Sequence, residues 1–566
     1  MGREIVPKEY PKEPGKYSRL WLHEDAFDIL TNHKGTKVIE GLTSKILSSS
    51  KVFKKMEILN LSHSYYLIQT PDFSSLPNLE KLILKDCTSL FKIDQSIGDL
   101  SNLVLVNLKD CIYLQTLPRS FYKLTSLKIL ILSGCSKIDD LANDLGEMES
   151  LATLRADNTA ITQVPFTIVK LKNLKHLSLC GCKGSPSETL PSLFCSQIPS
   201  INLLSARLQG LNSLTELCLR ECNLPDGAIP SDIGSLCSLQ SLDLGGNSFS
   251  SLPPSVGGLS RLSTFKLTCC KRLQSIPDLP VGLIFLVVTN CMALESMPDL
   301  SKFENMTSLS LINCHNLVEI PGLVKLSNPV VSVHMEGCRN LSTTFKQTFL
   351  QEWSMRGIGR FGIFLLGNDI PDWFTFKDEG SSVSFECAHS VEWNFKGFAT
   401  CIVYSSSVLV LSTYSTRISI INHTKNTIQT ITPTTIGGPT PPGDHLWLCN
   451  VHKSRVDFEG GDKVTVGVDF GPEIVVKKTG VCLAYDRAVE GKMMDYASTS
   501  SEDATHVVSD DKDATKDNVG MVPTRVIRDD KFKPKHELLI LQMDLFNLVN
   551  NMDETYMQQL SEDFRI

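Results

Sequence analysis

The sequence predicts an α/β solenoid of stacked coils, followed by a domain built only of strands. The first observation is a nine-residue frame, L-x-x-L-x-L-x-x-C, which recurs between residues 56 and 338. Its copies follow one another at steps of 21 to 25 residues, with a single step of 40. The second observation is a further apolar set after each frame, and the third is a series of short strand-like runs after residue 342.

The frame has the residue pattern of a strand with one buried face. Apolar residues at positions 4 and 6, such as Leu82 and Leu84, flank a single residue, which is the period of a strand. The apolar set that follows, as in Leu114-x-x-Leu117, returns the chain along the far side of the coil. Twelve frames are in phase, and they open at Met56, Leu79, Leu103, Leu127, Leu151, Leu174, Leu214, Leu239, Leu262, Leu283, Met306 and Val330.

One coil cannot bury its own leucines, so neighbouring coils must stack and share a continuous core. Steps of about 20 to 29 residues with one strand each are typical of leucine-rich repeats. We therefore predict a leucine-rich-repeat solenoid, or horseshoe, over residues 56–342. The step of 40 that begins at Leu174 is one normal step plus about 16 residues, and we interpret the excess within residues 183–211 as a loop insertion.

Position 9 of the frame holds small side chains that can hydrogen-bond to backbone, which indicates a structural role at a turn. Three frames place Ser64, Thr159 and Asn247 there. Stacked strands would bring neighbouring thiols within bridging distance, but their Cβ vectors run parallel, so we expect reduced, structural thiols. The other nine frames have cysteine at this position: Cys87, Cys111, Cys135, Cys182, Cys222, Cys270, Cys291, Cys314 and Cys338.

Composition and charge narrow the class of protein. The net charge of −7 argues against a nucleic-acid partner, and no apolar run reaches the roughly 20 residues that span a bilayer. The N-terminus is polar and shows no secretion signal. We therefore expect a cytoplasmic protein, with the nucleus as the alternative compartment.

Residues 1–55 do not fit the frame, and we assign them to the end of a nucleotide-binding region together with an N-terminal cap. Met1–Val6, Ser18–Trp21 and Ile39–Gly41 resemble the end of that region in plant intracellular immune receptors. These receptors, of the type of the tobacco mosaic virus resistance protein N, combine a TIR domain, a nucleotide-binding ATPase switch and leucine-rich repeats. The resemblance implies that Met1–Val6 follows the methionine-histidine-aspartate motif of the switch, so that the chain begins beyond the nucleotide-sensing histidine.

The two catalytic parts of that family have no counterpart in this sequence. No G-x-x-x-x-G-K-[ST] motif is present, and neither is the TIR glutamate that supports NAD cleavage in relatives. Gly357-x-Gly359-x-x-Gly362 spells a dinucleotide fingerprint but lacks the strand before it and the helix after it. Cys180-x-Cys182 lacks a second ligand pair at metal spacing. We expect no catalysis, metal or cofactor in this chain, and ADP or ATP only in full-length family members.

Frame positions 3, 5 and 7 are expected to point onto the concave face of the solenoid. These positions vary while the leucines do not, which fits a scaffold with a replaceable binding surface. Exposed apolar residues there are candidate anchors for a partner. The alternative interpretation is a solvated sheet whose charges only maintain solubility. The candidate partner-binding residues are Lys81, Lys85, Ile129, Ile131, Arg155, Asp157, His176, Glu216, Arg220, Asp243, Lys266, Phe285, His334 and Glu336.

Residues 343–490 are predicted to form an all-β sandwich or jelly roll, after a short helix at Thr343–Trp353. Leu366–Phe374 resembles part of the post-repeat jelly-roll domain, the C-JID domain, of the same receptors. The resemblance implies a second contact surface in its loops, while Trp373 and Phe374 are predicted to pack in the core or between domains rather than to contact a ligand. The predicted strands are Gly362–Leu366, Val383–Cys387, Gly397–Tyr404, Val408–Leu411, Arg417–Ile421, His445–Val451, Val464–Phe470, Ile474–Val476 and Val481–Tyr485.

The last residues divide into two further segments. Residues 491–536 are rich in acidic residues, Ser, Thr and Ala, a composition that predicts a disordered linker. Residues 537–566 carry apolar residues at helical spacing. We predict an amphipathic helix there, which docks either on the protein itself or on a partner.

Together these features predict a non-enzymatic recognition module of an intracellular plant immune receptor. The expected partner is a pathogen effector or a guarded host protein, bound through the concave face and the post-repeat domain in defence signalling. Other receptor domains or chains are further expected partners, whereas nucleic acid and a membrane span are not. Two alternatives stay open: an extracellular leucine-rich-repeat ectodomain, and a ubiquitin-ligase substrate adaptor.

Overall fold

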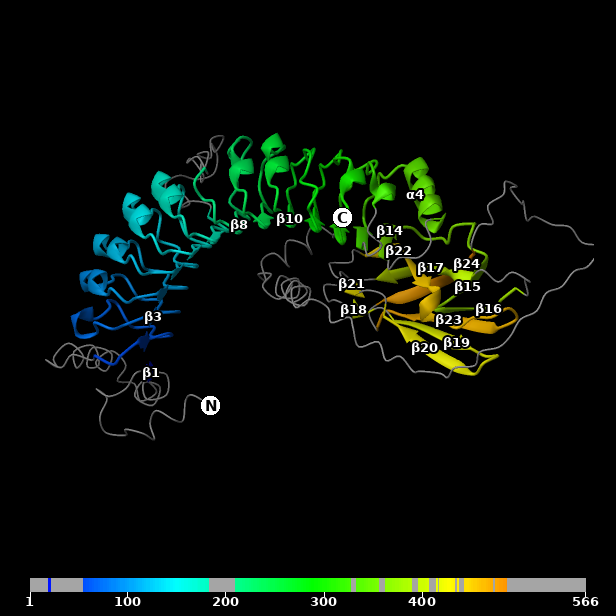
Figure 1. Ribbon diagram of the computed structural model, residues 1–566, viewed down its shortest axis with the longest axis horizontal. Coiled ribbons are helices and arrows are strands. Elements are labelled where there is room, and N and C mark those ends of the chain that lie inside the picture. Colours follow the sequence, from blue (N-terminus) through cyan, green and yellow to red (C-terminus); the bar gives the residue numbers. More distant parts are fainter. Residues whose placement is uncertain are drawn as a thin grey trace, which may run out of the picture.

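A curved array of coils is followed by a β-sandwich at its C-terminal end, as the computed structural model shows (Figure 1). This architecture confirms the predicted leucine-rich-repeat solenoid with a following all-β domain. Most of the N-terminal remnant, most of the insertion, the linker at 491–536 and the helix at 537–566 lie outside the described residues. The structure describes residues 19–21, 54–182, 209–326, 332–355, 362–388, 395–406, 414–415, 417–432, 435–436, 442–471 and 474–485.

Short strands run side by side along the inner side of the curve, and neighbouring strands pair in parallel (Figure 1). The pairings are in register, so position 4 of one frame lies beside position 4 of the next, as Leu82 lies beside Val106. The strands are β1 (Arg19–Trp21), β2 (Ile58–Asn60), β3 (Lys81–Ile83), β4 (Leu105–Asn107), β5 (Ile129–Ile131), β6 (Thr153–Arg155), β7 (His176–Ser178), β8 (Glu216–Cys218), β9 (Ser241–Asp243), β10 (Thr264–Lys266), β11 (Phe285–Val287), β12 (Ser308–Ser310) and β13 (Ser332–Met335).

Strand β1 extends the sheet one coil beyond the predicted start at Met56. It pairs in parallel with β2, with Leu20 beside Leu59. The frame did not predict this strand, because Asp25 rather than cysteine stands at position 9 and because the step from Tyr17 to Met56 is 39 residues. Apolar residues nevertheless occupy positions 1, 4 and 6 of this copy.

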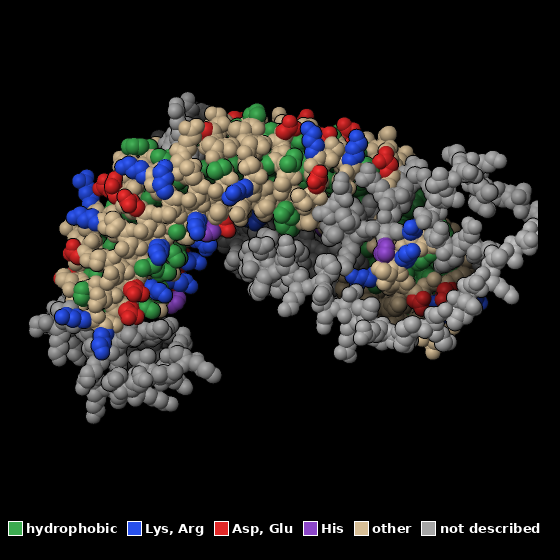
Figure 2. Space-filling model, viewed as in Figure 1, with side chains coloured by type: hydrophobic (Ala, Val, Ile, Leu, Met, Phe, Trp, Pro, Cys, Tyr) green, Lys and Arg blue, Asp and Glu red, His purple; other side chains and the backbone are tan. Residues whose placement is uncertain are grey.

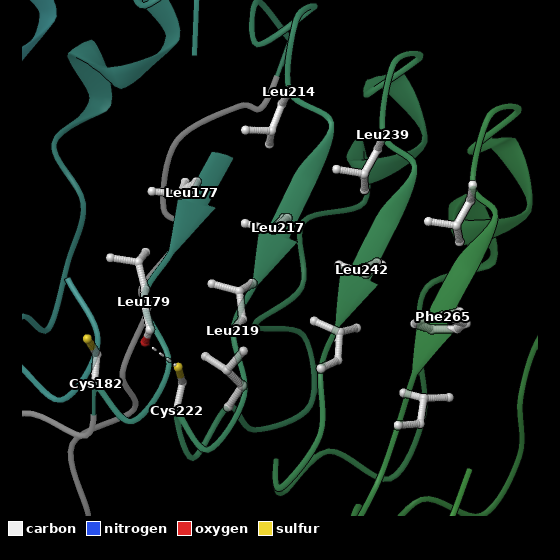
Figure 3. Close-up of a cluster of buried hydrophobic side chains, with 14 of the residues drawn as sticks. Leu177, Leu179, Cys182, Leu214, Leu217, Leu219, Cys222, Leu239, Leu242 and Phe265 are labelled. Carbon is white, nitrogen blue, oxygen red and sulfur yellow. Dashed lines mark hydrogen bonds between the residues drawn. The ribbon is translucent and has the colours of Figure 1, made fainter. Parts of the chain in front are cut away.

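The position-4 and position-6 side chains of successive coils line one continuous core. Leu177, Leu217, Leu242 and Phe265 follow one another across adjacent strands, and all four are buried (Figure 3). Stacking is what buries them, because each coil supplies only one layer of side chains. The far side of the coils carries 3-10 turns: η2 (Phe73–Ser75), η3 (Gln95–Asp99), η4 (Arg119–Lys123), η5 (Asn143–Glu147), η6 (Phe166–Lys170), η7 (Ile233–Ser235), η8 (Pro254–Gly258), η9 (Leu300–Lys302) and η10 (Leu323–Lys325).

Position 8 of every frame has a backbone conformation in the left-handed region, with φ between 54° and 81°. This region suits Gly, Asn and Asp, which accounts for much of the residue choice at the position. The tight turn directs the chain from the strand into the return path. The twelve residues are His63, Asp86, Asp110, Gly134, Asn158, Gly181, Glu221, Gly246, Cys269, Asn290, Asn313 and Gly337.

Gly134→Ala is expected to destabilise the array more than Gly227→Ala does. Both glycines have positive φ, 81° and 76°, and a left-handed alanine costs roughly 1–2 kcal/mol. A Cβ at residue 134 would also lie 2.1 Å from Oδ1 of Asp110, whereas a Cβ at residue 227 meets nothing within 4 Å. Urea unfolding of the two variants measures the difference, and equal losses of unfolding free energy would contradict the role of the Asp110 contact.

The sandwich consists of two facing sheets preceded by helix α4 (Thr343–Met355) (Figure 1). One sheet has the order β14-β22-β17-β24-β15, and the other β16-β23-β19-β20. Its strands are β14 (Gly362–Leu366), β15 (Phe376–Glu379), β16 (Ser382–Glu386), β17 (Phe395–Ser406), β19 (Arg417–Asn422), β20 (Thr427–Ile431), β22 (Gly443–His452), β23 (Lys463–Asp469) and β24 (Val475–Tyr485), with a small β18–β21 pair at Tyr414–Ser415 and Thr435–Ile436.

Some of these strands differ from the prediction. Strand β24 is continuous where two strands were predicted, and β15 and β20 were not predicted. β15 was not predicted because three of its four residues are charged. It therefore lacks the alternation of apolar and polar residues that is typical of a half-buried strand. Phe374 is buried in the core and stacks on Trp373, with ring centroids 4.1 Å apart. The strand predicted at residues 408–411 lies outside the described residues.

The solenoid sheet and the first sandwich sheet are one continuous sheet. β14 pairs in parallel with β13 and antiparallel with β22. Ile363 and Leu365 on one face of β14 join the solenoid core, whereas Phe364 on the other face joins the sandwich core. The repeat array therefore ends against the sandwich rather than in solvent.

Candidate partner-binding face

The concave face follows from the strand pattern, because residues on either side of each buried position-4 residue point away from the core. The structure leaves Lys81, Arg155 and Glu216 of the predicted set exposed. Figure 2 shows basic side chains gathered at the inner side of the N-terminal coils. The half-buried members of the set are Lys85, Ile129, Ile131, Asp157, His176, Arg220, Asp243, Lys266 and Phe285.

Two lysines at position 7 lie next to aspartates at position 8. Nζ of Lys85 lies 3.5 Å from Oδ2 of Asp86, and Nζ of Lys109 lies 4.0 Å from Oδ2 of Asp110. Partial burial raises the pKa of Asp110, and the nearby Asp86 carboxylate raises it further against the opposing effect of Lys109. The aspartates thus offset part of the charge of Lys85 and Lys109. Lys81, Lys109 and Arg155 are exposed cations of this part of the face.

The apolar candidates are less exposed than the sequence analysis expected. Ile129, Ile131 and Phe285 are half-buried rather than exposed. Strands in a sheet lie only about 4.8 Å apart, so side chains on neighbouring coils shield one another. Ile129 lies beside Leu105 and Thr153, and Ile131 beside Asn107 and Arg155, in the strand register. These isoleucines form the floor of the face rather than projecting anchors.

Asp157 holds three coils together. Its carboxylate accepts hydrogen bonds from Oγ of Ser133 at 2.9 Å, from Oγ of Ser178 and from the backbone N–H of Cys180 at 3.0 Å. Two further candidate carboxylates are also engaged. Asp243 accepts a hydrogen bond from the backbone N–H of Gly245, and Glu216 contacts Nδ1 of His176 at 3.0 Å. Charged side chains in the middle of the face therefore help to hold neighbouring coils together.

A disulfide joins Cys180, two residues past the end of β7, to Cys218 at the end of β8, with their Cα atoms 5.9 Å apart. The expectation of unpaired thiols concerned the cysteines at position 9, where the Cβ vectors are parallel. Cys180 stands at position 7 of its frame and Cys218 at position 5 of the next, so the bridge runs diagonally between neighbouring coils. Arg220, also in this region, contacts Glu221 through Nε at 3.0 Å.

His334 and Glu336 do not belong to the accessible face, and their prediction as partner contacts is wrong. The two side chains are only 6% and 1% exposed. The sheet continues past β13, so the Phe364 ring of β14 stacks on the His334 ring with centroids 4.4 Å apart. Nδ1 of His334 lies 3.2 Å from Oε1 of Glu336, and Nε2 lies 2.8 Å from Oγ of Ser332. This buried cluster belongs to the junction with the sandwich.

The cysteines at position 9 connect each coil to the one before it. Figure 3 shows the thiol of Cys222 donating to the carbonyl oxygen of Leu179, at 3.0 Å. Burial raises the pKa of Cys135 and of Cys222 to about 12, so these thiols stay protonated donors at neutral pH rather than nucleophiles. All nine are free and buried, and each donates to a preceding coil at 2.9 to 3.3 Å: Cys87, Cys111, Cys135, Cys182, Cys222, Cys270, Cys291, Cys314 and Cys338.

An exposed, largely aromatic patch on the first three predicted coils was not predicted from the frame. Six of the twelve exposed large hydrophobic side chains in the described residues lie here, which is far more than an even distribution would give. The backbone N–H of Phe91 donates to the carbonyl of Ile68 at 2.8 Å, which places adjacent coils side by side. Apolar residues at frame positions 10, 11 and 13 were the available signal: Tyr65, Tyr66, Ile68, Phe91, Ile112 and Tyr113.

Nowhere in the described part of the chain do three or more His, Cys, Asp or Glu side chains meet as a group that could hold a metal ion. None of its helices combines the length and apolar character needed to cross a membrane. The surfaces described above are open faces suited to contact with another macromolecule.

Both parts of the chain match known families. The C-JID domain model matches residues 365–490, and the Leucine Rich Repeat model matches residues 238–259. Disease resistance-like protein DSC1 of Arabidopsis thaliana is 31% identical over 272 residues, covering 46% of this chain and 20% of the relative. TMV resistance protein N of Nicotiana glutinosa is 29% identical over 274 residues, covering 47% of this chain and 21% of the relative.

Among solved structures, the leucine-rich repeat domain of the type III effector XopL is 22% identical. The similarity covers 41% of this chain and 73% of that one, with a TM-score of 0.32. The chain spans about a fifth of the length of the plant relatives named above. The chain thus joins a leucine-rich-repeat array to a segment, residues 365–490, that matches the C-JID domain, and it is similar in sequence to plant disease resistance proteins.

Proposed function

We propose that this chain is the recognition part of a plant immune receptor and binds a protein partner without catalysis or a bound nucleotide of its own. The observation that carries the proposal is the combination of a repeat array and a C-JID domain on one sheet, in a chain related to disease resistance proteins. An extended concave sheet suits a macromolecule better than a small ligand. A pathogen effector or a guarded host protein in the cytoplasm is the partner we propose.

The N-terminal half of the concave face favours a partner with an acidic surface. Lys81 and Arg155 are exposed, and the half-buried Ile129 and Ile131 lie between them in the strand order. An apolar floor with a basic rim resembles the anatomy of protein interfaces, in which buried apolar area supplies affinity and rim charges supply steering. The aromatic patch around Tyr65 and Phe91 offers a second area for the same or another protein.

Charge reversal on the concave face tests the proposal. A double variant with Lys81→Glu and Arg155→Glu is expected to weaken binding to an acidic partner by about tenfold, mainly through slower association at low salt. Lys123→Glu with Lys302→Glu is the matched control, because both lysines are exposed on the far-side turns η4 and η9.

The purified chain is first tested against a panel of pathogen effectors and host target proteins by pull-down. Association and dissociation rates are then measured for each binder by interferometry, with both double variants. Unchanged association and dissociation rates in the concave-face variant would show that the partner binds another surface of the chain. Failure of the whole panel to bind would leave the chain without the recognition role that we propose.

A further inference from the structure

In the two sheets of the sandwich, three strands pair with a neighbour on one side only, as far as the described residues extend. These edge strands are β15, β16 and β20, which pair with β24, β23 and β19 respectively. An edge strand presents unpaired backbone N–H and C=O groups that can accept another strand. Natural proteins protect such edges with charged residues, proline, bulges or a covering segment.

Two of the three edges carry charged protection and the third does not. β15 contains Lys377, Asp378 and Glu379, and β16 ends with the exposed Glu386. β20 reads Thr-Ile-Gln-Thr-Ile, with no charged residue, proline or glycine. Its Ile428 side chain is 73% exposed, more than any other large hydrophobic side chain in the described part of the chain.

β20 is complementary to itself in an antiparallel arrangement centred on Gln429. In this register Ile428 of one copy lies opposite Thr430 of the other, and Thr427 lies opposite Ile431. Cross-strand pairs between β-branched residues stabilise sheets, and two facing glutamine amides can hydrogen-bond across the two-fold axis. No charged residues meet, whereas a β15 edge paired with itself would bring charged side chains together.

We propose that β20 is a dimerisation edge, at which a second copy of this chain pairs antiparallel and joins the two β16-β23-β19-β20 sheets into one. The contact is isologous, so it closes as a two-fold dimer and does not propagate. In Figure 1, β20 lies at the rim of the sandwich that is turned away from the solenoid. Pairing at this rim leaves the concave face of each copy open, so the proposal goes beyond partner recognition and does not depend on it.

The interface is small, since only five residues of each copy pair, so the dimer is expected to be weak and reversible. Multi-angle light scattering of the full chain across a concentration series should show the mass rising from one copy toward two. Thr430→Lys is expected to raise the dimer dissociation constant by about tenfold or more, because lysine on an edge opposes pairing. Thr430 is exposed, so the fold tolerates the change.

Ser382→Lys is the matched control, because it places the same charge on the exposed β16 edge of the same sheet. The control is expected to dimerise like the wild type. A wild-type chain that stays monomeric at all concentrations overturns the proposal. Equal loss of dimer in both lysine variants, or association into species larger than a dimer that Thr430→Lys leaves unchanged, also overturns it.

The register gives a second, independent test. Gln429→Cys places two thiols opposite each other at the two-fold axis, so mild oxidation should give a dimer linked through residue 429 of both copies. Thr427→Cys places each thiol opposite Ile431 and should cross-link far less. Mass spectrometry of the linked peptides identifies the site, and equal yields or linkage of residue 429 to another segment would exclude the proposed register.

Discussion

A chain that ends at residue 342 is expected to be largely insoluble, although all twelve repeat frames remain in it. Strand β13 would lose its parallel partner β14 and present an unpaired edge, which promotes aggregation. The solenoid core would also lose Phe349 and Leu350 of α4 and Ile363 and Leu365 of β14, all of which are buried against it. Repeat arrays need a cap at each end, and the sandwich is the C-terminal cap here.

Soluble yield and the void-volume fraction in size exclusion measure this effect. A chain that ends at residue 485 retains every described strand, and it is the control that should remain soluble. A soluble chain ending at residue 342 that unfolds cooperatively would show that the array does not need the sandwich. The same reasoning makes deletion of the C-JID domain a poor test of partner binding, because loss of folding would abolish binding too.

Phe364→Ala is expected to destabilise the protein by about 3–5 kcal/mol, the usual range for a fully buried phenylalanine. The Phe364 ring stacks on His334 at 4.4 Å and on Trp447 at 6.2 Å between ring centroids. Its removal would leave a cavity where the last coil meets the sandwich, beside His334, which contacts the buried carboxylate of Glu336. Both the solenoid and the sandwich should lose stability, since they share this sheet.

Phe166→Ala is the matched control for this substitution. Phe166 lies on the far-side turn η6 and is 65% exposed, so its loss should change the unfolding free energy by no more than about 0.5 kcal/mol. Urea unfolding followed by circular dichroism compares the two variants with the wild type. Similar free-energy losses at the two positions would mean that the junction packing contributes little to stability.

The repeat array was predictable because its determinants recur within each coil. Leucines at positions 4 and 6 and cysteine at position 9 indicate which side chains turn inward, and the coils stack in that register. The same pattern did not predict strand β1, because Asp25 stands where the frame has cysteine. The left-handed backbone conformation at position 8 was not predicted either. Both signals are present in the sequence, as the apolar Leu20 and the Gly, Asn and Asp residues at position 8 show.

The candidate binding face was only partly predictable. Frame positions identified exposed residues such as Lys81 and Arg155, because exposure there depends on neighbouring coils of the same pattern. The frame positions predicted exposure wrongly for His334 and Glu336, because the segment that covers these residues belongs to another domain. They also could not show that Asp157 would be engaged by Ser133 and Ser178 on the two adjacent coils.

The sequence by itself determined the stacked coils, the inward leucines and the buried thiols, because each depends on contacts between neighbours about 24 residues apart that repeat along the chain. Only the tertiary structure decided where the sheet continues and where it stops. β14 pairs with β22, and Phe364 lies beside Trp447, through contacts between segments about 80 residues apart. Such pairings leave no periodic trace in either segment, and they determine which residues the junction buries and which edge stays open.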